Sequence, residues 1–252
     1  MNNTKEIHNS QPFRGIYPVY KERGETLAVL LDRFRGEHHL DKDVKLTYAG
    51  RLDPIAEGIV LILAGEDRFS KDKLLGLDKI YEVDVLLGIA TDTQDPLGLI
   101  TETLYKDSSG IEQVIEDMKS IATLPYPIYS SVPVDGKPLF VHARAGTDVK
   151  IPQKKVTIYS AELLEIKKQP LATLAQLVLK DIAKVTGDFR QEEIIQSWQK
   201  LLDEMSEVTL VRIRVHASSG TYMRSLAAWM GEKLGVPALA YRINRIQSGE
   251  YK

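Results

Sequence analysis

Asp53 stands in a segment whose residue types and spacing could present a catalytic carboxylate. In the sequence YAGRLDP, residues 48–54, the aspartate lies between a glycine turn and a proline, and an apolar run follows at residues 58–64. A carboxylate held rigidly at the end of a strand can act as a nucleophile. Leu-Asp-Pro is also ordinary loop sequence, because Asp initiates turns and Pro fixes them. The segment alone therefore supports both interpretations.

Tyr81 and Arg224 have side chains that could act together with that carboxylate. Tyr81 lies on the apolar face of an alternating segment, residues 79–88, where core packing is the simpler interpretation and where its hydroxyl would need a partner. Arg224 follows a Ser-Ser-Gly-Thr turn and falls in the first turn of a predicted helix, where the helix dipole disfavours a cation. Arg224 is therefore either a surface cation or the partner of a nearby anion.

Several other chemistries find no support in the sequence. There is no GxGxxG segment and no Walker loop, so a nucleotide cofactor is not indicated. The five histidines fall at no metal-ligand spacing, there is no cysteine, and no nucleophile elbow supports a Ser-His-Asp hydrolase. We therefore expect a protein that uses neither a cofactor nor a metal.

Length and composition indicate a globular protein. The chain has 252 residues, of which 43% are hydrophobic, and no apolar run approaches the roughly 20 residues of a membrane span. The N-terminus lacks the apolar core of a signal peptide, and residues 1–13 are expected to form a flexible tail. We expect a cytoplasmic, monomeric protein that does not contact a membrane.

The net charge of −2 hides an uneven distribution of charge along the chain. Residues 211–252 contain seven Lys or Arg against two Glu, and residues 133–159 contain five basic residues against two acidic ones. Residues 181–207 contain seven acidic residues against three basic ones. The pattern predicts a basic face that could bind nucleic acid, although a mixed, solvated surface is the simpler interpretation.

The elements that must position these side chains alternate irregularly between strands and helices. Alternating or apolar runs predict strands at 14–21, 58–64, 79–88, 155–166 and 208–216. Helical spacing predicts helices from Thr26 to Phe34 and over 67–75, 111–121, 171–184, 191–205 and 222–234. Because no regular βαβ rhythm is present, we predict an α+β fold.

Several ordered segments of the chain resemble the TruB family of RNA pseudouridine synthases, which isomerise the T-loop uridine at position 55 of tRNA. The resemblance covers roughly residues 14–166 and 208–251. It is carried by Lys21 with Gly24-Glu25-Thr26, Gly50-Arg51-Leu52-Asp53-Pro54 with Gly58, Lys79-Ile80-Tyr81, Gly88-Ile89-Ala90-Thr91-Asp92-Thr93-Gln94-Asp95-Pro96-Leu97-Gly98, Pro127-Ile128-Tyr129-Ser130-Ser131 with Gly136-Lys137 and Ala143-Arg144-Ala145-Gly146, and Gly220-Thr221-Tyr222-Met223-Arg224-Ser225-Leu226.

The resemblance implies a fold and a set of roles. It implies a mixed, mostly antiparallel sheet flanked by helices over residues 14–252, with an RNA-gripping segment at 126–155. Asp53 takes the place of the nucleophile, Arg224 is its ion-pair partner, and Tyr81 packs on the base and exchanges a proton. The residues expected to contact substrate or RNA, partly from the basic character of 133–159, are Lys21, Tyr48, Arg51, Lys79, Tyr129, Lys137, Arg144, Lys150, Lys154 and the pocket residue Ile243.

The implied activity needs no cofactor. A C–N glycosidic bond is cut, the uracil turns, and a C–C bond forms. A carboxylate could attack the sugar, attack the base, or deprotonate the sugar, and the sequence does not select among these routes. The carboxylate must be ionised, which a neighbouring arginine favours. The target base must be flipped out of the folded RNA at a cost of a few kcal/mol, which basic residues binding phosphates help to offset.

The chain departs from the family pattern at several positions. Tyr48 replaces a usual histidine, Arg51 replaces a threonine, and Glu22 replaces a proline. Residues 168–206 resemble a helical insertion, for which an inert surface pair is the simplest expectation. The chain ends at Lys252, which leaves no room for the C-terminal RNA-binding PUA domain that many members carry.

Three functions remain open at the level of sequence. The first is isomerisation of the tRNA T-loop uridine, with tRNA as the partner. The second is pseudouridine formation in another RNA, such as ribosomal RNA, which the Tyr48 and Arg51 departures keep open. The third is a non-catalytic helper of tRNA folding, against which the intact Asp53, Tyr81 and Arg224 set argues, because binding alone does not require that set.

Overall fold

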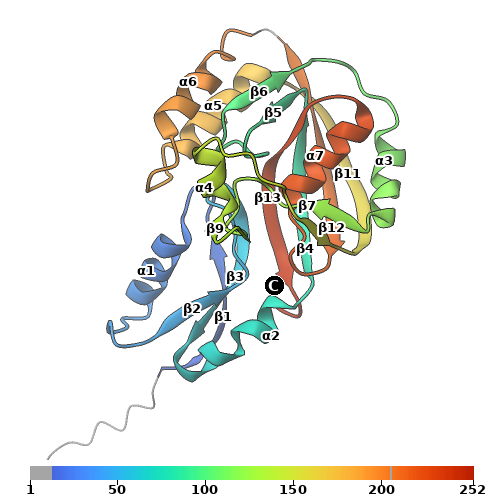
Figure 1. The fold of residues 1–252 in the computed structure, drawn as a ribbon. Coiled ribbons are helices and arrows are strands. Elements are labelled where there is room, and N and C mark those ends of the chain that lie inside the picture. Colours follow the sequence, from blue (N-terminus) through green and yellow to red (C-terminus); the bar gives the residue numbers. More distant parts are fainter. Residues whose placement is uncertain (1–12, 205) are drawn as a thin grey trace, which may run out of the picture.

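A seven-stranded sheet runs through the computed structural model, which describes residues 13–204 and 206–252 (Figure 1). Neighbouring strands of this sheet are antiparallel, with one exception. The last strand of the chain, β13, runs parallel to β3 through Asn244 and Arg245. In order across the sheet, the strands are β1 (Gly15–Lys21), β3 (Glu57–Ala64), β13 (Ala238–Ser248), β4 (Lys79–Leu87), β12 (Glu207–Ala217) and β11 (Ile158–Pro170), with β2 (Leu46–Ala49) also pairing with β3.

Three small two-stranded sheets and a set of short helices complete the described chain. The small sheets pair β5 (Ile89–Thr91) with β6 (Ile100–Thr103), β7 (Thr123–Pro125) with β10 (Gln153–Lys155), and β8 (Pro133–Val134) with β9 (Lys137–Pro138). The helices are α1 (Leu27–Glu37), η1 (Gly65–Ser70), α2 (Lys71–Leu75), α3 (Ile111–Asp117), η2 (Met118–Ser120), α4 (Leu139–Arg144), α5 (Leu171–Ile182), α6 (Gln191–Gln199) and α7 (Met223–Leu234).

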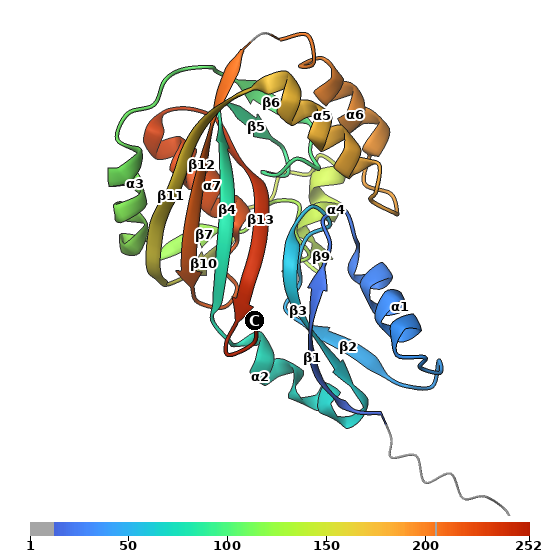
Figure 2. The ribbon, with the colours of Figure 1, turned by 180° about the vertical axis from the view of Figure 1, so that it is seen from behind.

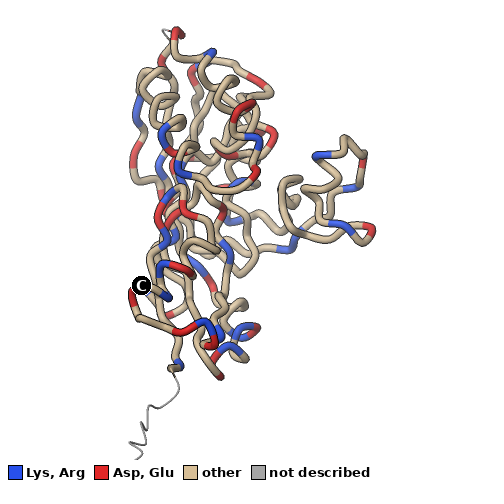
Figure 3. Tube along the Cα trace, turned by 90° about the vertical axis from the view of Figure 1, so that its left-hand side faces the viewer, with Lys and Arg blue, Asp and Glu red and all other residues tan. Residues whose placement is uncertain are grey.

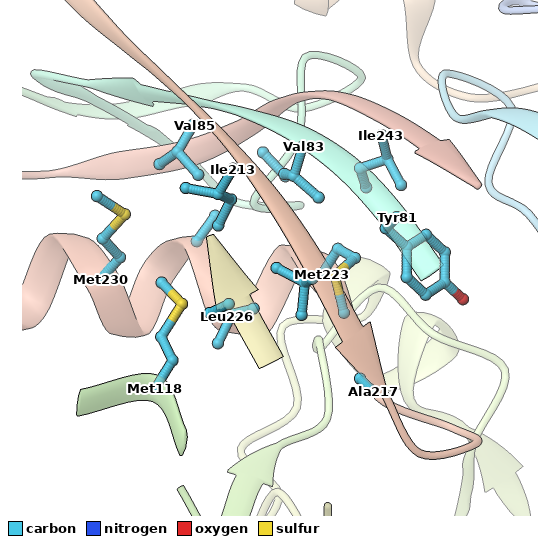
Figure 4. Packing of buried hydrophobic residues seen from close by; sticks show 14 of the residues in the cluster. Tyr81, Val83, Val85, Met118, Ile213, Ala217, Met223, Leu226, Met230 and Ile243 are labelled. Atoms are coloured by element: carbon cyan, nitrogen blue, oxygen red, sulfur yellow. The ribbon is translucent and has the colours of Figure 1, made fainter. Parts of the chain in front are cut away.

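The largest hydrophobic cluster packs α7 and α3 against one face of the sheet. On β4, alternation sends Tyr81, Val83 and Val85 to this face, as the sequence predicts, because successive side chains of a strand point to opposite sides. Figure 4 shows these side chains packed against Met230 of α7 and its neighbours. This packing fixes the position of Tyr81, which lies at the end of the cluster.

A second hydrophobic cluster lies around α5 and α6, the pair predicted as a helical insertion. It includes Leu174 and Val178 of α5 and the fully buried Trp198 of α6, packed with Leu86 and Leu239 of the sheet. Leu86 alternates with Val85, so this cluster lies on the face opposite the first one. The helical pair is therefore anchored to the sheet rather than attached loosely to the surface.

The segment predicted to grip RNA, residues 126–155, contains β8, β9, α4 and β10. Figure 3 shows it protruding from the rest of the chain and carrying Lys and Arg along its length. The back view places α4 beside the loop that joins α5 to α6 (Figure 2). Two segments that are distant in sequence thus lie side by side.

Two strands of the sheet are absent from the predicted set, and several boundaries differ. The alternation rule does not predict β2 or β13, and β11 extends to Pro170, beyond the predicted end at Ile166. The pairing of β13 with β4 shifts register between Ala240 and Arg242 and again between Arg245 and Gln247. Such bulges interrupt a period of two, which is the signal that sequence analysis reads.

The predicted N-terminal tail, residues 1–13, lies outside the described residues except for Phe13. The Phe13 ring stacks on Tyr17 with ring centroids 5.3 Å apart and packs against Phe34 of α1. Phe13 is thus part of the packed structure. Across residues 13–204 and 206–252, none of the helices is both long and apolar enough to cross a membrane.

Candidate active site

A cavity of about 660 Å³ opens where the Asp53 loop meets the beginning of α7. Its walls come from five separated parts of the chain: residues 50–56, 93–97, 129–144, 188–190 and 219–224. Leu75 of α2, two residues of β4 and two of β13 complete it, the last four being Lys79, Tyr81, Ile243 and Arg245. The cavity therefore gathers all three residues with predicted catalytic roles.

Asp53 and Arg224 form an ion pair inside this cavity. Nε of Arg224 lies 2.8 Å from Oδ2 of Asp53, although the N–H bond is not aimed well enough at that oxygen to make a good hydrogen bond. The Arg224 side chain is 3% exposed and that of Asp53 is 38% exposed. The structure thus rules out the alternative of Arg224 as a surface cation, and it leaves the carboxylate accessible to a ligand.

Asp95 is a second carboxylate beside Arg224. Its Oδ2 lies 3.7 Å from Nε of Arg224, and its Oδ1 accepts hydrogen bonds from the Thr93 hydroxyl and the Leu97 amide at 2.7 and 2.9 Å. Burial raises the pKa of Asp95, Arg224 lowers it, and the negative charge of Asp53 raises it. Burial disfavours the Arg224 cation, but Asp53 and Asp95 outweigh burial and raise its pKa. Arg224 therefore remains a cation between two carboxylates.

Arg224 connects three loops, two of them through its Nη groups. Nη1 donates to the Thr93 carbonyl at 2.9 Å, and Nη2 donates to the Tyr129 carbonyl at 3.2 Å. The ion pair with Asp53 adds the third loop. A planar guanidinium suits this role because its donors are fixed in one geometry.

Tyr81 brings an aromatic face and a hydroxyl to the same cavity. Its ring, 8% exposed, ends the hydrophobic cluster on β4, and its hydroxyl points away from the aliphatic side chains (Figure 4). Ile243 of β13 lines the cavity beside it. An apolar wall with a hydroxyl at its edge can hold a flat ring and exchange a proton with it.

Arg245 holds the Asp53 loop in place through hydrogen bonds to its backbone. It is 2% exposed, and its guanidinium donates to the carbonyls of Ile59, Arg51 and Gly50 at 2.6, 3.2 and 2.9 Å. Gly58 permits this arrangement: its φ is +112°, and a Cβ would lie 2.3 Å from the Arg245 backbone oxygen. The loop is therefore fixed by a buried cation and by a strand contact that only glycine allows.

Lys21 does not lie where the resemblance implies. An RNA contact is expected at this position, but the side chain is fully buried, and Nζ donates to the carbonyls of Pro54, Ala56 and Glu22. A buried ammonium surrounded by carbonyls cannot reach a phosphate. Lys21 is instead a second support of the Asp53 loop, and this corrects the prediction.

The burial of Lys21 predicts a pH-dependent stability. Burial lowers the pKa of Lys21 to about 8, with Glu25 and Asp53 opposing that shift. Between pH values of about 8 and 10.5, the pKa values of Lys21 in the folded and unfolded states, the folded state binds fewer protons than the unfolded state. The contribution of Lys21 to the free energy of unfolding therefore rises with pH in this range, and this gain is lost as pH falls through about 8. We expect the unfolding free energy of the wild type, relative to Lys21→Met, to increase by up to about 3 kcal/mol between pH 7 and pH 10.5.

Urea denaturation of both proteins at these pH values measures the difference. Lys79, whose pKa burial also lowers to about 8, is present in both proteins, so its effect cancels. A difference between the two proteins that does not change with pH would contradict the assignment of the shift to Lys21.

The remaining residues expected to contact RNA divide into two groups. Arg51, Lys79, Tyr129, Arg144 and Ile243 line the cavity. The Lys79 ammonium donates to the carbonyls of Leu75 and Leu77, so it supports the wall rather than offering a free charge. Outside the cavity wall are Tyr48 on β2, whose ring lies 5.4 Å from the Lys71 ammonium, and Lys137, Lys150 and Lys154 on the protruding segment.

The cavity wall also contains residues that the sequence does not mark as site residues, among them Asp95, Arg245, Phe189 and Arg190. Asp95 belongs to the segment Gly88–Gly98, which resembles a family motif, and this is the sequence signal for it. Arg245 was counted only as part of a basic region, although its burial makes it structural. Phe189 and Arg190 line the cavity from the α5–α6 loop, and no motif marks them.

The arrangement can perform acid–base or nucleophilic chemistry on a flat ring. It combines an accessible carboxylate, a buried cation that favours its ionised form, and an aromatic hydroxyl on an apolar wall. In the part of the chain that the structure describes, no group of three or more His, Cys, Asp or Glu could hold a metal ion. The mouth adds the cations Arg51 and Arg144, as a phosphate-bearing ligand would require.

Comparison with known proteins agrees with this geometry. The family model described as TruB family pseudouridylate synthase (N terminal domain) matches residues 38–183. The tRNA pseudouridine synthase B of Staphylococcus aureus strain JH9 is 31% identical over 245 residues, which is 95% of this chain and 68% of that relative. The same values hold for the protein of strain Newman.

Solved structures share the fold at lower sequence identity. An H/ACA RNP bound to a substrate RNA containing 2′-deoxyuridine matches with a TM-score of 0.53 and 18% identity, covering 94% of this chain and 48% of that chain. A Cbf5–Nop10–Gar1 complex matches with a TM-score of 0.56 and 19% identity, covering 94% and 50%. The chain thus spans about half the length of these solved chains, and the likeness concerns the fold alone.

Proposed function

The chain belongs to the TruB family of pseudouridine synthases, enzymes that isomerise uridine in RNA to pseudouridine, and we propose that its substrate is the T-loop uridine of tRNA. The observation that supports this proposal is the meeting of Asp53, Tyr81 and Arg224 in one cavity with arginines at its mouth. The Staphylococcus aureus relatives, at 31% identity, carry the name tRNA pseudouridine synthase B.

Asp53 starts the reaction in this proposal. The glycosidic C–N bond breaks, the uracil turns within the cavity, and a bond forms from its C5 to the sugar C1′, while the proton of C5 passes to N1 by way of a base and solvent. Asp53 acts on the sugar or the base as a nucleophile or as a base, and each route requires its ionised form. Arg224 favours that form through the 2.8 Å contact.

Tyr81 holds the detached uracil and takes part in the proton transfer. Its ring and Ile243 offer an apolar wall for the base, and its hydroxyl faces away from the aliphatic cluster. Keeping the freed base in place is the central requirement, because a lost uracil cannot reattach. A closed wall on one side and an acid–base group at its edge meet that requirement.

The protruding segment, residues 126–155, supplies phosphate contacts that help offset the cost of flipping the uridine out of its stack. Lys137 and Lys150 are exposed there, and Arg144 is 39% exposed at the cavity mouth. Base flipping costs a few kcal/mol, and contacts between cations and phosphates supply most non-specific affinity for RNA.

Tritium release tests the substrate directly. RNA transcribed with uridine labelled at C5 loses one tritium for each pseudouridine formed, because C5 exchanges its hydrogen for the sugar carbon. We expect the wild-type protein to release one equivalent from a T-loop stem-loop and none when the target uridine is replaced by cytidine. Tritium release from ribosomal RNA transcripts alone would instead favour pseudouridine formation in ribosomal RNA. Tyr48, which lies outside the cavity wall, keeps that function open.

A further inference from the structure

The turn that joins α5 to α6 forms a wall of the active-site cavity. Its residues Asp188, Phe189 and Arg190 line the cavity together with Tyr129 and Arg144 of the protruding segment. The sequence suggested an inert surface pair for this insertion. That expectation is wrong for the turn, because three of its residues line the cavity.

The turn is held in a defined shape. The Gln191 side chain accepts a hydrogen bond from the Phe189 amide at 2.9 Å and donates to the carbonyls of Gly187 and Val185 at 2.6 and 3.2 Å. Gly187 has φ +102°, and a Cβ there would lie 3.2 Å from the Phe189 ring. The Phe189 ring is partly buried against the α5–α6 cluster. The side chain is therefore presented to the cavity with little freedom left to lose on binding.

Arg190 ties the turn to the protruding segment. Its Nη1 lies 2.8 Å from Oδ2 of Asp92, and its guanidinium lies 4.5 Å from the centre of the Tyr129 ring. The Arg190 and Asp92 side chains are 18% and 21% exposed, so this contact is partly shielded from water. Because the carbonyl of the same Tyr129 accepts from Arg224, the turn and the catalytic arginine position one residue from two sides.

The contact between Arg144 and Asp188 is of a different kind. Their closest charged atoms lie 3.5 Å apart, and the side chains are 39% and 84% exposed. Nη2 of Arg144 also donates a hydrogen bond to the backbone carbonyl of Asp188 at 2.8 Å. Exposed pairs of this kind contribute little to stability, so a phosphate can replace the carboxylate without a large loss. Arg144 is thus held near the mouth of the cavity and can be released to an anionic ligand.

The cavity has room for more than one base. Its volume of about 660 Å³ lies in the range of sites for drug-sized molecules, which are larger than a uracil ring. Tyr81 and Asp53 occupy the end that the target base requires, whereas Phe189 lies on the wall formed by the α5–α6 turn. A flat ring beside Phe189 would stack on it, as bases do on exposed aromatic side chains.

We infer that the turn Gly187–Arg190 is a second RNA-binding element of the active site, in which Phe189 stacks on the nucleotide next to the extruded uridine. Arg144 exchanges the Asp188 carboxylate for the phosphate of that same nucleotide. The inference rests on the proposed function, since it assumes an RNA substrate with one base extruded. It assigns to the insertion a role in substrate affinity rather than in bond making.

Abasic RNA tests the stacking contact. The RNAs are the intact stem-loop and stem-loops with a single abasic site at one of the positions flanking the target uridine. Dissociation constants for wild type, Phe189→Ala and Phe189→Leu are measured by fluorescence anisotropy, and kcat is measured by tritium release. We expect both variants to bind the intact RNA about tenfold more weakly, as loss of a stacked base predicts, with kcat within about twofold of wild type. Phe189→Leu keeps apolar packing against the helices, so it separates stacking from folding.

The pattern across RNAs identifies the partner nucleotide. In wild type, one abasic position should weaken binding about tenfold, and in Phe189→Leu that same position should cause no further loss. Phe69→Ala is the matched control, because Phe69 is 72% exposed and lies outside the cavity wall. Equal losses from abasic substitution in wild type and Phe189→Leu, or unchanged affinity in both Phe189 variants, would overturn the inference.

Failure of the proposed function has a separate signature. If wild type releases no tritium from T-loop RNA, the substrate assignment fails. The dissociation constants of the Phe189 variants can then still be measured by anisotropy with the RNA that binds, either the T-loop or the ribosomal RNA. They decide whether Phe189 contacts a base. The two conclusions therefore do not stand or fall together.

Discussion

Asp53→Asn abolishes pseudouridine formation and leaves RNA binding intact: this is the largest effect that the structure predicts. Asparagine has almost the same shape as aspartate, but it can act neither as a nucleophile nor as a base. We expect kcat to fall by at least about 10⁴-fold, as with loss of other catalytic nucleophiles, and the dissociation constant for RNA to change by less than about threefold. Tritium release in a single turnover and anisotropy measure the two quantities.

Stability separates this result from simple unfolding. The Asp53 side chain is 38% exposed and Arg224 keeps Asp95 as a partner, so Asp53→Asn should lower the melting temperature only slightly. Asp72→Asn, at an exposed position on α2, is the matched control and should retain full activity. An Asp53→Asn protein that still converts uridine at a rate near that of wild type would end the assignment of Asp53 as the reacting group.

The sequence indicates Asp53, Tyr81 and Arg224 as candidate catalytic residues because each carries a local signal and lies in a segment that resembles the TruB family. Asp53 stands between a glycine and a proline, Tyr81 follows a period of two, and Arg224 follows a turn. None of these signals contains a distance. The 2.8 Å contact between Arg224 and Asp53 depends on the pairing of β3 with β13 and on the packing of α7 against β13, which only the folded chain provides. The solved structures that share the fold confirm the predicted α+β class.

The predictions that failed share a physical cause. The family resemblance predicts an RNA contact at Lys21, yet its ammonium is satisfied by carbonyls of the Asp53 loop. The strand β13 escapes the alternation rule because the register shift between Ala240 and Arg242 places Ala240 and Ile243 on one face at a spacing that no strand template contains. The turn containing Phe189 was underestimated because its contacts with Tyr129 and Arg144 are long-range. In each case a tertiary contact overrides a local pattern.

The Arg224→Met substitution removes a charge that two carboxylates share. Methionine fills similar space, but it leaves Asp95 buried at 5% exposure without its cation. Removing one partner of a buried pair typically costs 3–5 kcal/mol, so we expect the unfolding free energy in urea to fall by about that amount. Activity should fall by at least about 100-fold, because Asp53 loses the contact that positions it and keeps it ionised.

The pH dependence of that loss identifies Asp95 as its source. Burial raises the pKa of Asp95 and Arg224 lowers it, so the variant should have a still higher pKa at this position. A folded state that binds a proton more readily than the unfolded state loses stability as pH rises from 3.8 through the folded pKa. The deficit of Arg224→Met relative to wild type should therefore be smaller at pH 5 than at pH 8. Adding Asp95→Asn to Arg224→Met should recover part of the stability at pH 8 without restoring activity. A stability deficit that changes neither with pH nor on adding Asp95→Asn would contradict this explanation. Arg224 would then stabilise the fold through its hydrogen bonds to the carbonyls of Thr93 and Tyr129.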